Sequence, residues 1–159
     1  MERRTAEEIV AIYSRNADRV YRVCMMFFKG KRYDAKDAVQ TTFLKLMNSS
    51  ISFKDSEHEK AWLIVTASNV CRDMLRSAWR KREELDASRL AAAPLPYQDD
   101  DILSSVMALP DNCKTAVYMY YYEGFSCGEI ARAMGKTTAS VWGYLYKGRA
   151  MLKEALKEE

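Results

Sequence analysis

The sequence has few of the residues that usually carry enzymatic chemistry. His58 is the only histidine, and no two of the four cysteines, Cys24, Cys71, Cys113 and Cys127, have CxxC spacing. Nucleophile elbows, phosphate-binding glycine loops and HExxH zinc motifs are all missing. We therefore expect a protein that is not an enzyme, binds no metal, needs no cofactor and packs its cysteines as reduced thiols.

Long apolar runs are also missing. No run approaches the roughly 18 residues that a membrane span requires, and the first residues are charged, unlike a signal peptide. Of the 159 residues, 48% are hydrophobic and 30% are charged, which is ordinary for a globular chain with a packed core. We expect one or two small domains in a cytoplasmic protein that does not insert into membranes.

Charge and turn-forming residues are unevenly distributed. The first 90 residues carry a net charge of +5 and the remainder −2, and five of the six glycines lie in the last forty residues. Between these parts, residues 86–101 combine Pro94 and Pro96 with an acidic end and show no apolar periodicity. We therefore predict a domain at residues 1–85, a linker at 86–101 and a second domain at 102–159.

The spacing of apolar residues predicts an all-α fold, with two small helical domains joined by the linker. A capping box, Thr5-x-x-Glu8, precedes apolar residues that share one helix face: Ile9, Tyr13, Ala17, Val20, Cys24 and Phe27. Gly30 is expected to end this helix.

Two further helices complete the predicted first domain. Asp34 is the expected N-cap of the second, whose apolar face carries Val39, Phe43 and Met47. Ser56 with Glu59 forms another capping box, and no proline follows before Pro94. A long third helix can therefore extend from about residue 57 to about residue 84.

The second domain contains the most informative segment. A helix before Pro110 and another at about residues 112–123 precede a third capping box, Ser126 with Glu129. Gly135 lies where a tight turn needs positive φ, Thr137 or Thr138 can cap the next helix, and Val141 can fill the corner. This spacing is typical of a helix-turn-helix that places its second helix in a DNA major groove, and a structural helical hairpin is the alternative.

Three motifs in order give the chain a resemblance to a known family. Asp34 to Leu44 resembles D-A-x-D-x-x-Q-x-x-F-L, Ala61 to Arg76 resembles A-W-L…N…D-x-L-R, and Leu109 to Arg149 resembles a segment with L-P, E-G-x-S-x-x-E-I-A and a turn glycine. Together they resemble the extracytoplasmic-function (ECF) sigma factors of bacterial RNA polymerase, over almost the whole chain. The resemblance implies three partners: polymerase core, promoter DNA and an anti-sigma protein, with no small-molecule substrate.

The resemblance also implies a polymerase-docking surface on the second helix. Asp34, Asp37 and Gln40 recur every three residues and share its polar face. From the residues alone, the two aspartates would only cap the helix and favour its positive end. The docking residues that the resemblance implies are Asp34, Asp37, Gln40, Thr41 and Leu44.

The third helix and the segment before it are expected to bind the minus-ten element. Arg72, Arg76 and Arg80 recur every four residues with Trp79 among them, a pattern that suits phosphates and an unstacked base, although a solvated helix face is the alternative. The resemblance implies that residues 53–58, here named the capture loop, hold a flipped base. The expected minus-ten residues are Lys54, Asp55, Ser56, His58, Asn69, Arg72, Arg76 and Arg80.

The expected minus-thirty-five contacts lie on the last helix: Thr138, Ser140, Trp142, Gly143, Tyr144, Lys147 and Arg149. Family members often have T-V-K-S-R-L where this chain has Ser140 to Leu145, so aromatic and small residues replace the lysine and arginine. We expect apolar contacts to thymine methyl groups there. Two alternatives to a sigma factor stay open: a sigma-like helix-turn-helix regulator that does not itself support initiation, and a helical interaction protein without nucleic-acid function.

Overall fold

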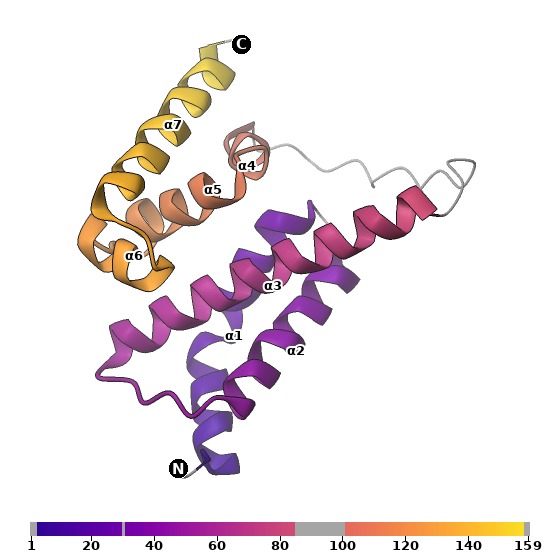
Figure 1. Ribbon diagram of the computed structural model, residues 1–159, viewed down its shortest axis with the longest axis vertical. Coiled ribbons are helices and arrows are strands. Elements are labelled where there is room, and N and C mark those ends of the chain that lie inside the picture. The colour runs from indigo at the N-terminus through magenta and orange to yellow at the C-terminus, as the bar shows by residue number, and fades with distance from the viewer. Residues whose placement is uncertain (1–2, 30, 85–100, 158–159) are drawn as a thin grey trace. The chain divides into compact units, whose positions relative to one another are not determined.

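The computed structural model describes residues 3–29, 31–84 and 101–157. Within these ranges every regular element is a helix, which confirms the predicted all-α fold (Figure 1). Gly30 and all but the last residue of the predicted linker lie outside the described residues. The elements are α1 (Ala6–Phe28), α2 (Arg32–Asn48), α3 (Ser56–Glu84), α4 (Asp101–Met107), α5 (Asp111–Val117), the π-helical turn η1 (Tyr118–Tyr122), α6 (Cys127–Met134) and α7 (Thr138–Lys157).

The backbone forms two compact units. Residues 1–51 and 66–98 form the first, and residues 52–65 and 99–159 form the second. The first unit therefore holds α1, α2 and the later part of α3, and the second holds the start of α3 together with α4 to α7. The predicted domain limits stay predictions.

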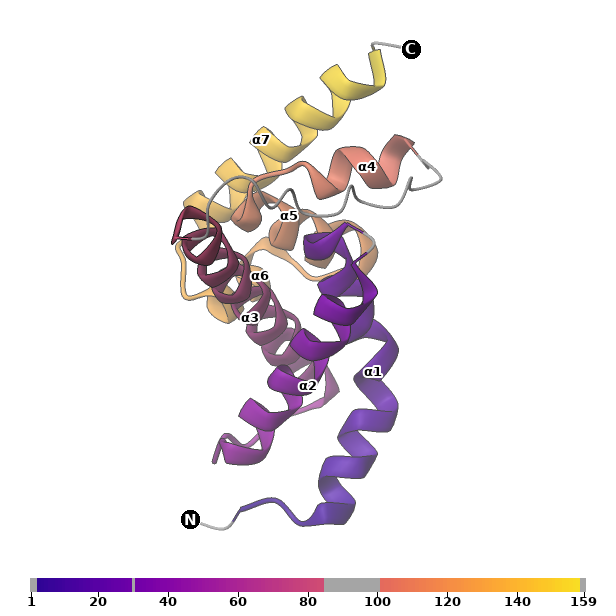
Figure 2. The same cartoon turned by 90° about the vertical axis from the view of Figure 1, so that its right-hand side faces the viewer.

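Helices α1 and α2 pack against each other in the first unit (Figures 1 and 2). Thr5 caps α1 as predicted, because its hydroxyl accepts the backbone N–H of Glu8 at 3.2 Å. Val20, Cys24 and Phe27 are buried, as the apolar spacing predicts. The burial of this face, rather than helix propensity, supplies most of the stability of α1.

Two residues predicted for these apolar faces lie at the surface instead. Tyr13 is 48% exposed and Met47 is 47% exposed. Tyr13 packs edge-on against Phe43, with ring centroids 4.9 Å apart, so one side of its ring is still shielded. The prediction was wrong because the face that contacts α2 is centred on other residues of the same period, including Ile12 and Asn16 on α1.

The turn between α1 and α2 is tighter than the sequence indicates. Lys29, just after α1, has a left-handed φ of 42°. The backbone N–H of Lys31 then donates to the carbonyl of Phe28 at 2.9 Å, and α2 begins at Arg32. Asp34 is therefore not the N-cap but a residue of the first turn, where its carboxylate still faces the positive end of the helix dipole.

The segment after α2 is held by a residue from the N-terminus. The guanidinium of Arg4 donates to the carbonyl oxygens of Leu46 at 3.4 Å and Ser49 at 3.2 Å, and also to that of Ile51. Carbonyls at a helix C-terminus lack intrahelical partners, so a cation there is favourable. Arg4 thus fixes the path of the chain from α2 toward α3.

Helix α3 begins one residue earlier than predicted. Its cap is Asp55, whose carboxylate accepts the backbone N–H of His58 at 2.8 Å, whereas Ser56 is the first helical residue. The expected Ser56–Glu59 capping box is therefore wrong. Asp55 takes the role because a carboxylate at this position satisfies an orphan N–H and also favours the helix dipole.

The expected helix at residues 112–123 begins at Asp111 and changes character at Tyr118. Residues 118–122 form the π-helical turn η1, after which Gly124 has a φ of 79°. The wider turn buries Tyr118 and Met119 and leaves the three following tyrosines exposed. Tyr118 also stacks on Tyr122, with ring centroids 5.1 Å apart.

The helix-turn-helix of the second unit has the geometry that the sequence predicts. Gly135 ends α6 with a φ of 65°, and the hydroxyl of Thr137 accepts the backbone N–H of Ser140 at 3.0 Å. Thr137 rather than Thr138 is thus the cap of α7. Val141 is fully buried and fills the corner, together with the buried side chains of Ile130, Ala131 and Leu145.

The capping box of α6 is complete. The backbone N–H of Glu129 donates to the Ser126 hydroxyl at 3.1 Å, and the backbone N–H of Ser126 donates to the Glu129 carboxylate at 2.9 Å. These hydrogen bonds hold the pKa of Glu129 below its usual range, the backbone N–H of Ser126 contributing most. The charged form of Glu129 therefore stabilises the second unit at neutral pH.

We expect Ser126→Ala to lower the free energy of unfolding of the second unit by about 1 kcal/mol. Glu129→Gln keeps an acceptor but removes the charge. Because the folded pKa is depressed, the advantage of wild type over Glu129→Gln is present at neutral pH and shrinks as pH falls through that pKa. Urea unfolding at several pH values, followed through the NMR amide signals of α6 and α7, measures both effects. A pH-independent difference would contradict this account.

Candidate nucleic-acid and polymerase interfaces

The capture loop, residues 53–58, leads into the first turn of α3. Lys54, Asp55 and Ser56 are exposed, and His58 is half-buried. The backbone N–H of Lys54 donates to Nδ1 of His58 at 3.1 Å, and Phe53 lies edge-on to the His58 ring. The structure thus brings the four predicted loop residues together, with three side chains directed to solvent.

The predicted basic residues of α3 differ in exposure. Arg76 is exposed, whereas Arg72 is half-buried and donates from Nη2 to Oδ1 of Asn69 at 2.7 Å. Nε of Arg72 is buried without a hydrogen-bond partner in the described part of the chain. The side chain of Arg80 lies outside the described residues, and Trp79 is 63% exposed. Arg72 and Asn69 thus form a hydrogen-bonded pair, whereas the side chain of Arg76 is exposed to solvent.

One line of exposed side chains runs along α2. It contains Tyr33, Asp37, Gln40, Leu44 and Met47, which recur every three or four residues and so share a face; we call it the docking stripe. Three of these residues belong to the predicted polymerase set. Thr41 does not lie on the stripe: it is half-buried, and its hydroxyl donates to the carbonyl of Asp37 at 2.9 Å.

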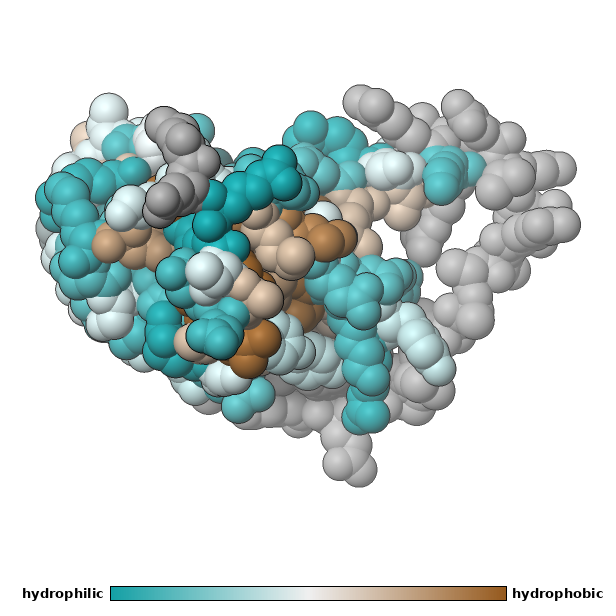
Figure 3. All heavy atoms as spheres, turned by 90° about the horizontal axis from the view of Figure 1, so that it is seen from below, coloured by the Kyte–Doolittle hydropathy of each residue, from teal (hydrophilic) through white to brown (hydrophobic). Residues whose placement is uncertain are grey.

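Apolar side chains are also exposed to solvent where α1 begins and α2 ends. Figure 3 views the molecule from below, and brown side chains gather between hydrophilic ones on that side. The exposed large apolar residues of these two helix ends are Val10, Tyr13, Leu44 and Met47. Exposed apolar side chains on two helices that pack together are typical of a protein-binding site.

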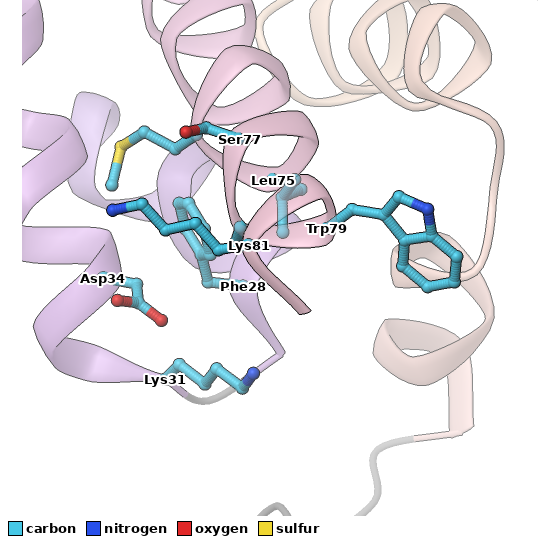
Figure 4. Close-up of a pocket in the computed structure, with 9 residues that line it drawn as sticks. Phe28, Lys31, Asp34, Leu75, Ser77, Trp79 and Lys81 are labelled. Carbon is cyan, nitrogen blue, oxygen red and sulfur yellow. The ribbon is translucent and has the colours of Figure 1, made fainter. Parts of the chain in front are cut away.

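Asp34, the remaining predicted docking residue, lies apart from the stripe. It is half-buried on the wall of a cavity of about 500 Å³ between the α1–α2 turn and the later part of α3 (Figure 4). Phe28 and Leu75 form apolar parts of the lining, and Lys31 and Lys81 add two amino groups. The indole of Trp79, which also lines the cavity, points away from the others (Figure 4).

Helix α7 turns only some of the predicted residues outward. Thr138, Trp142, Gly143 and Tyr146 are exposed on its first half and form the recognition face. Trp142 is 54% and Tyr146 74% exposed, and a side-chain carbon built on Gly143 would meet nothing within 4 Å. Lys147 and Arg149 are exposed just beyond.

Tyr144 and Ser140 are half-buried rather than fully presented. The hydroxyl of Tyr144 accepts from Nδ2 of Asn112 at 3.4 Å, so its ring lies toward α5. Arg149 donates to the hydroxyl of Tyr121 at 3.3 Å, which orients its guanidinium. The recognition face therefore contains a threonine, two aromatic side chains and a glycine but no cation.

Three residues that the sequence analysis passed over belong to these sites. Arg4 fixes the segment before the capture loop, Tyr33 extends the docking stripe and Tyr146 extends the recognition face. The position of Tyr146, four residues after Trp142, could have identified it. Nothing in the sequence near Arg4 indicates carbonyl partners more than 40 residues away.

Two family models match this chain, one in its first half and one in its second half. A Sigma-70 region 2 model matches residues 12–81, and a Sigma-70, region 4 model matches residues 99–152. The chain belongs to the Sigma-70 family of sigma factors. The two predicted domains, joined by a linker, correspond to these two regions. Members of the family are non-enzymatic transcription factors that direct bacterial RNA polymerase to specific promoters, so a helical interaction protein or a regulator without initiation function is not favoured.

Curated relatives agree with the two models and identify the chain as a sigma factor of the ECF group. The chain is 31% identical over 152 residues to the ECF RNA polymerase sigma factor SigE of Mycolicibacterium smegmatis; the match covers 89% of this chain and 58% of that relative. It is 25% identical to the sigma factor SigV of Bacillus subtilis, and this match covers 87% of this chain and 85% of SigV. It is 24% identical to SigW of the same organism, and that match covers 95% of this chain and 88% of SigW. The chain thus spans less than two thirds of the SigE relative's length and most of the other two.

Two solved structures share the fold of the ECF sigma factor described here. The sigma factor RpoE of Bartonella quintana, solved with the anti-sigma factor NepR, has a TM-score of 0.72 at 22% identity over 95% of both chains. CnrH, solved with the cytosolic domain of CnrY, has a TM-score of 0.68 at 19% identity over 98% of this chain and 91% of that one. None of the helices in residues 3–29, 31–84 and 101–157 combines the length and apolarity needed to cross a membrane.

Proposed function

We propose that this sigma factor recruits core polymerase through α2, reads two promoter elements with two separate surfaces, the capture loop and the recognition face, and helps to open the DNA between them. The observation that carries the proposal is the fully formed helix-turn-helix with an exposed recognition face on α7. The exposed capture loop before α3 is the second DNA-directed surface, and it lies in a separate part of the sequence. No cofactor is needed, because every step is binding.

The capture loop and α3 suit the single strand of the minus-ten element. Lys54 and Arg76 are exposed cations that can neutralise phosphates, and Asp55 and Ser56 present acceptors and a donor to base edges. Arg72 is held by Asn69, so we assign this pair to positioning the strand. Arg80 completes the proposed minus-ten set.

The docking stripe suits a helical surface of core polymerase. Leu44 and Met47 supply apolar area, and Asp37 and Gln40 supply polar contacts on the same face. Interfaces of this kind combine an apolar centre with a polar rim. Thr41 and Asp34 adjoin the stripe without lying on it, and we assign them to its support.

The recognition face suits a thymine-containing minus-thirty-five element. An indole and a phenol ring can pack against C5 methyl groups, which the major groove exposes only at thymine. Thr138 and Ser140 add hydroxyls, and Lys147 and Arg149 contact phosphates. Since Gly143 carries no side chain, the backbone of α7 can approach the bases closely there.

We expect Trp142→Ala to reduce transcription that depends on the minus-thirty-five element by about tenfold, as the loss of one good base contact does. Because Trp142 is half-exposed, the free energy of unfolding should change by less than about 0.5 kcal/mol. Tyr144→Phe should behave in the opposite way, with a stability loss of up to about 1 kcal/mol from the Asn112 bond and little effect on promoter choice. Transcription assays and urea unfolding on both variants separate the two roles.

We also propose that the protein acts in the bacterial cytoplasm and is controlled by an anti-sigma protein. The two solved structures described above contain partners, an anti-sigma factor in one and a cytosolic domain in the other. The exposed tyrosines of η1, Tyr120, Tyr121 and Tyr122, offer such a partner aromatic surface on the second unit.

Run-off transcription tests the proposed function. Core polymerase is incubated with a pool of genomic fragments, with and without this protein, and the transcript starts are sequenced. We expect new defined starts that share sequence at both the minus-ten and minus-thirty-five positions. Binding to core without new starts would indicate a sigma-like regulator, and failure to bind core would overturn the proposal.

A further inference from the structure

The chain between α2 and α3 is fixed at both ends, although it has no regular secondary structure. Arg4 holds the entry through the carbonyls of Ser49 and Ile51, and the backbone N–H of Ile51 donates to the Ser49 hydroxyl at 3.0 Å. At the other end, just before α3, the ring of His58, the only histidine in the sequence, accepts a backbone hydrogen bond from Lys54.

His58 makes three contacts within five residues of sequence. Its backbone N–H donates to the carboxylate of Asp55 at 2.8 Å, and its ring Nδ1 accepts the backbone N–H of Lys54 at 3.1 Å. The ring also lies at 90° to Phe53, with centroids 5.3 Å apart, and Phe53 packs edge-on against Trp62, with centroids 5.9 Å apart. The loop is thus closed onto the first turns of α3 by the imidazole of His58 together with the contact between Phe53 and Trp62.

The hydrogen bond from Lys54 also fixes the form of the ring. A nitrogen that accepts a hydrogen bond carries no proton, so the proton of the neutral imidazole lies on Nε2. Two distinct roles are then open to His58. Nδ1 can hold the backbone of the loop, or Nε2–H can donate directly to DNA.

We propose that His58 is a positioning residue, which sets the backbone of the capture loop through Nδ1 so that Lys54, Asp55 and Ser56 meet the strand already ordered. This inference rests on the proposed function of the loop. Its physical basis is conformational entropy, because each backbone residue that must be fixed on binding loses conformational freedom. A loop held before binding avoids much of that loss.

Two substitutions separate the positioning role from direct contact. In His58→Asn, the side-chain oxygen can take the place of Nδ1 and accept the Lys54 N–H, but no group reaches the place of Nε2. In His58→Gln, the longer side chain reaches the place of Nε2 and cannot replace Nδ1 without distortion. His58→Ala lacks both, and the matched control is Lys60→Ala, which truncates a half-buried side chain paired with Glu57 in the same turn of α3.

The variants are assayed as full-length chains in holoenzyme, on a promoter found by the start-site experiment. Promoter opening is measured as permanganate reactivity of unpaired thymines, and affinity for core polymerase is measured separately. Hydrogen exchange at the Lys54 amide in the free protein reports the hydrogen bond itself. We expect His58→Asn and Lys60→Ala to open the promoter nearly as well as wild type. His58→Gln and His58→Ala should fall by about fivefold, the effect of one lost hydrogen bond, with faster Lys54 exchange and unchanged core affinity.

Three outcomes would overturn the inference. Normal opening by His58→Gln with a defect in His58→Asn would show that Nε2 contacts DNA. Equal defects in all three His58 variants would assign the role to the ring rather than to Nδ1, and no defect in any of them would leave His58 without a role. If wild-type holoenzyme opens no promoter, the proposed function itself fails, and the inference fails with it.

Discussion

Leu44→Ala should reduce affinity for core polymerase about tenfold or more, while the free energy of unfolding changes by less than about 0.5 kcal/mol. The side chain is 54% exposed on the docking stripe, so its removal leaves little cavity in the free protein. At an interface centre, by contrast, truncating an apolar anchor can cost 2 kcal/mol or more, and a factor of ten corresponds to about 1.4 kcal/mol. Fluorescence anisotropy with labelled sigma factor measures the affinity.

Leu156→Ala is the matched control for this experiment. Leu156 is 44% exposed near the end of α7, outside every site proposed here. Its truncation removes the same atoms from a similarly exposed position and should leave core affinity unchanged. A loss in both variants, or in neither, would contradict the docking stripe as the polymerase surface.

Gly148→Ala should destabilise the second unit by about 1–3 kcal/mol, the usual cost of overpacking a core. Gly148 is buried on α7 where this helix crosses α5. A side-chain carbon built on it would lie 2.7 Å from Cγ2 of Val117, and the branched side chain of Val117 has little freedom to move away. Helices α5 and α7 would therefore have to move apart to make room for the added methyl group.

Gly143→Ala, on the same helix, should instead raise the free energy of unfolding of the second unit. There the added carbon meets nothing within 4 Å, so only helix propensity changes, which favours alanine over glycine by about 1 kcal/mol. Urea unfolding followed through the NMR amide signals of α5 and α7 measures both variants. Stabilisation by Gly148→Ala would show that α5 and α7 do not approach as closely as described.

Local patterns in the sequence were sufficient to predict most of the helices. Thr5, Ser126 and Gly135 each act within one turn of the chain, so their roles at helix ends follow from residue type and spacing alone. The corner residue Val141 was predictable for the same reason. Errors occurred where two residues compete for one role, as Asp55 and Ser56 do at the start of α3.

Contacts between helices determine which residues of a helix face are buried, and the sequence pattern alone does not show these contacts. A helical period shows which residues share a face, but the neighbouring helix determines how much of that face is covered, so Tyr13 and Met47 remained exposed. Likewise, Tyr144 and Tyr146 are equivalent in sequence terms, and only the position of α5 turns Tyr144 inward. The role of Arg4 could not be predicted for the same reason, because its carbonyl partners are more than 40 residues away in the sequence.

Site-specific cross-linking tests most directly whether the capture loop and the recognition face read two different promoter elements. A photo-reactive amino acid is placed at Ser56 in the capture loop or at Trp142 on the recognition face, and each sigma factor is assembled with core polymerase on a promoter. We predict cross-links from position 56 to the non-template strand at the minus-ten element and from position 142 to duplex DNA at the minus-thirty-five element. Cross-links from both positions to one element, or none from position 142, would contradict the account.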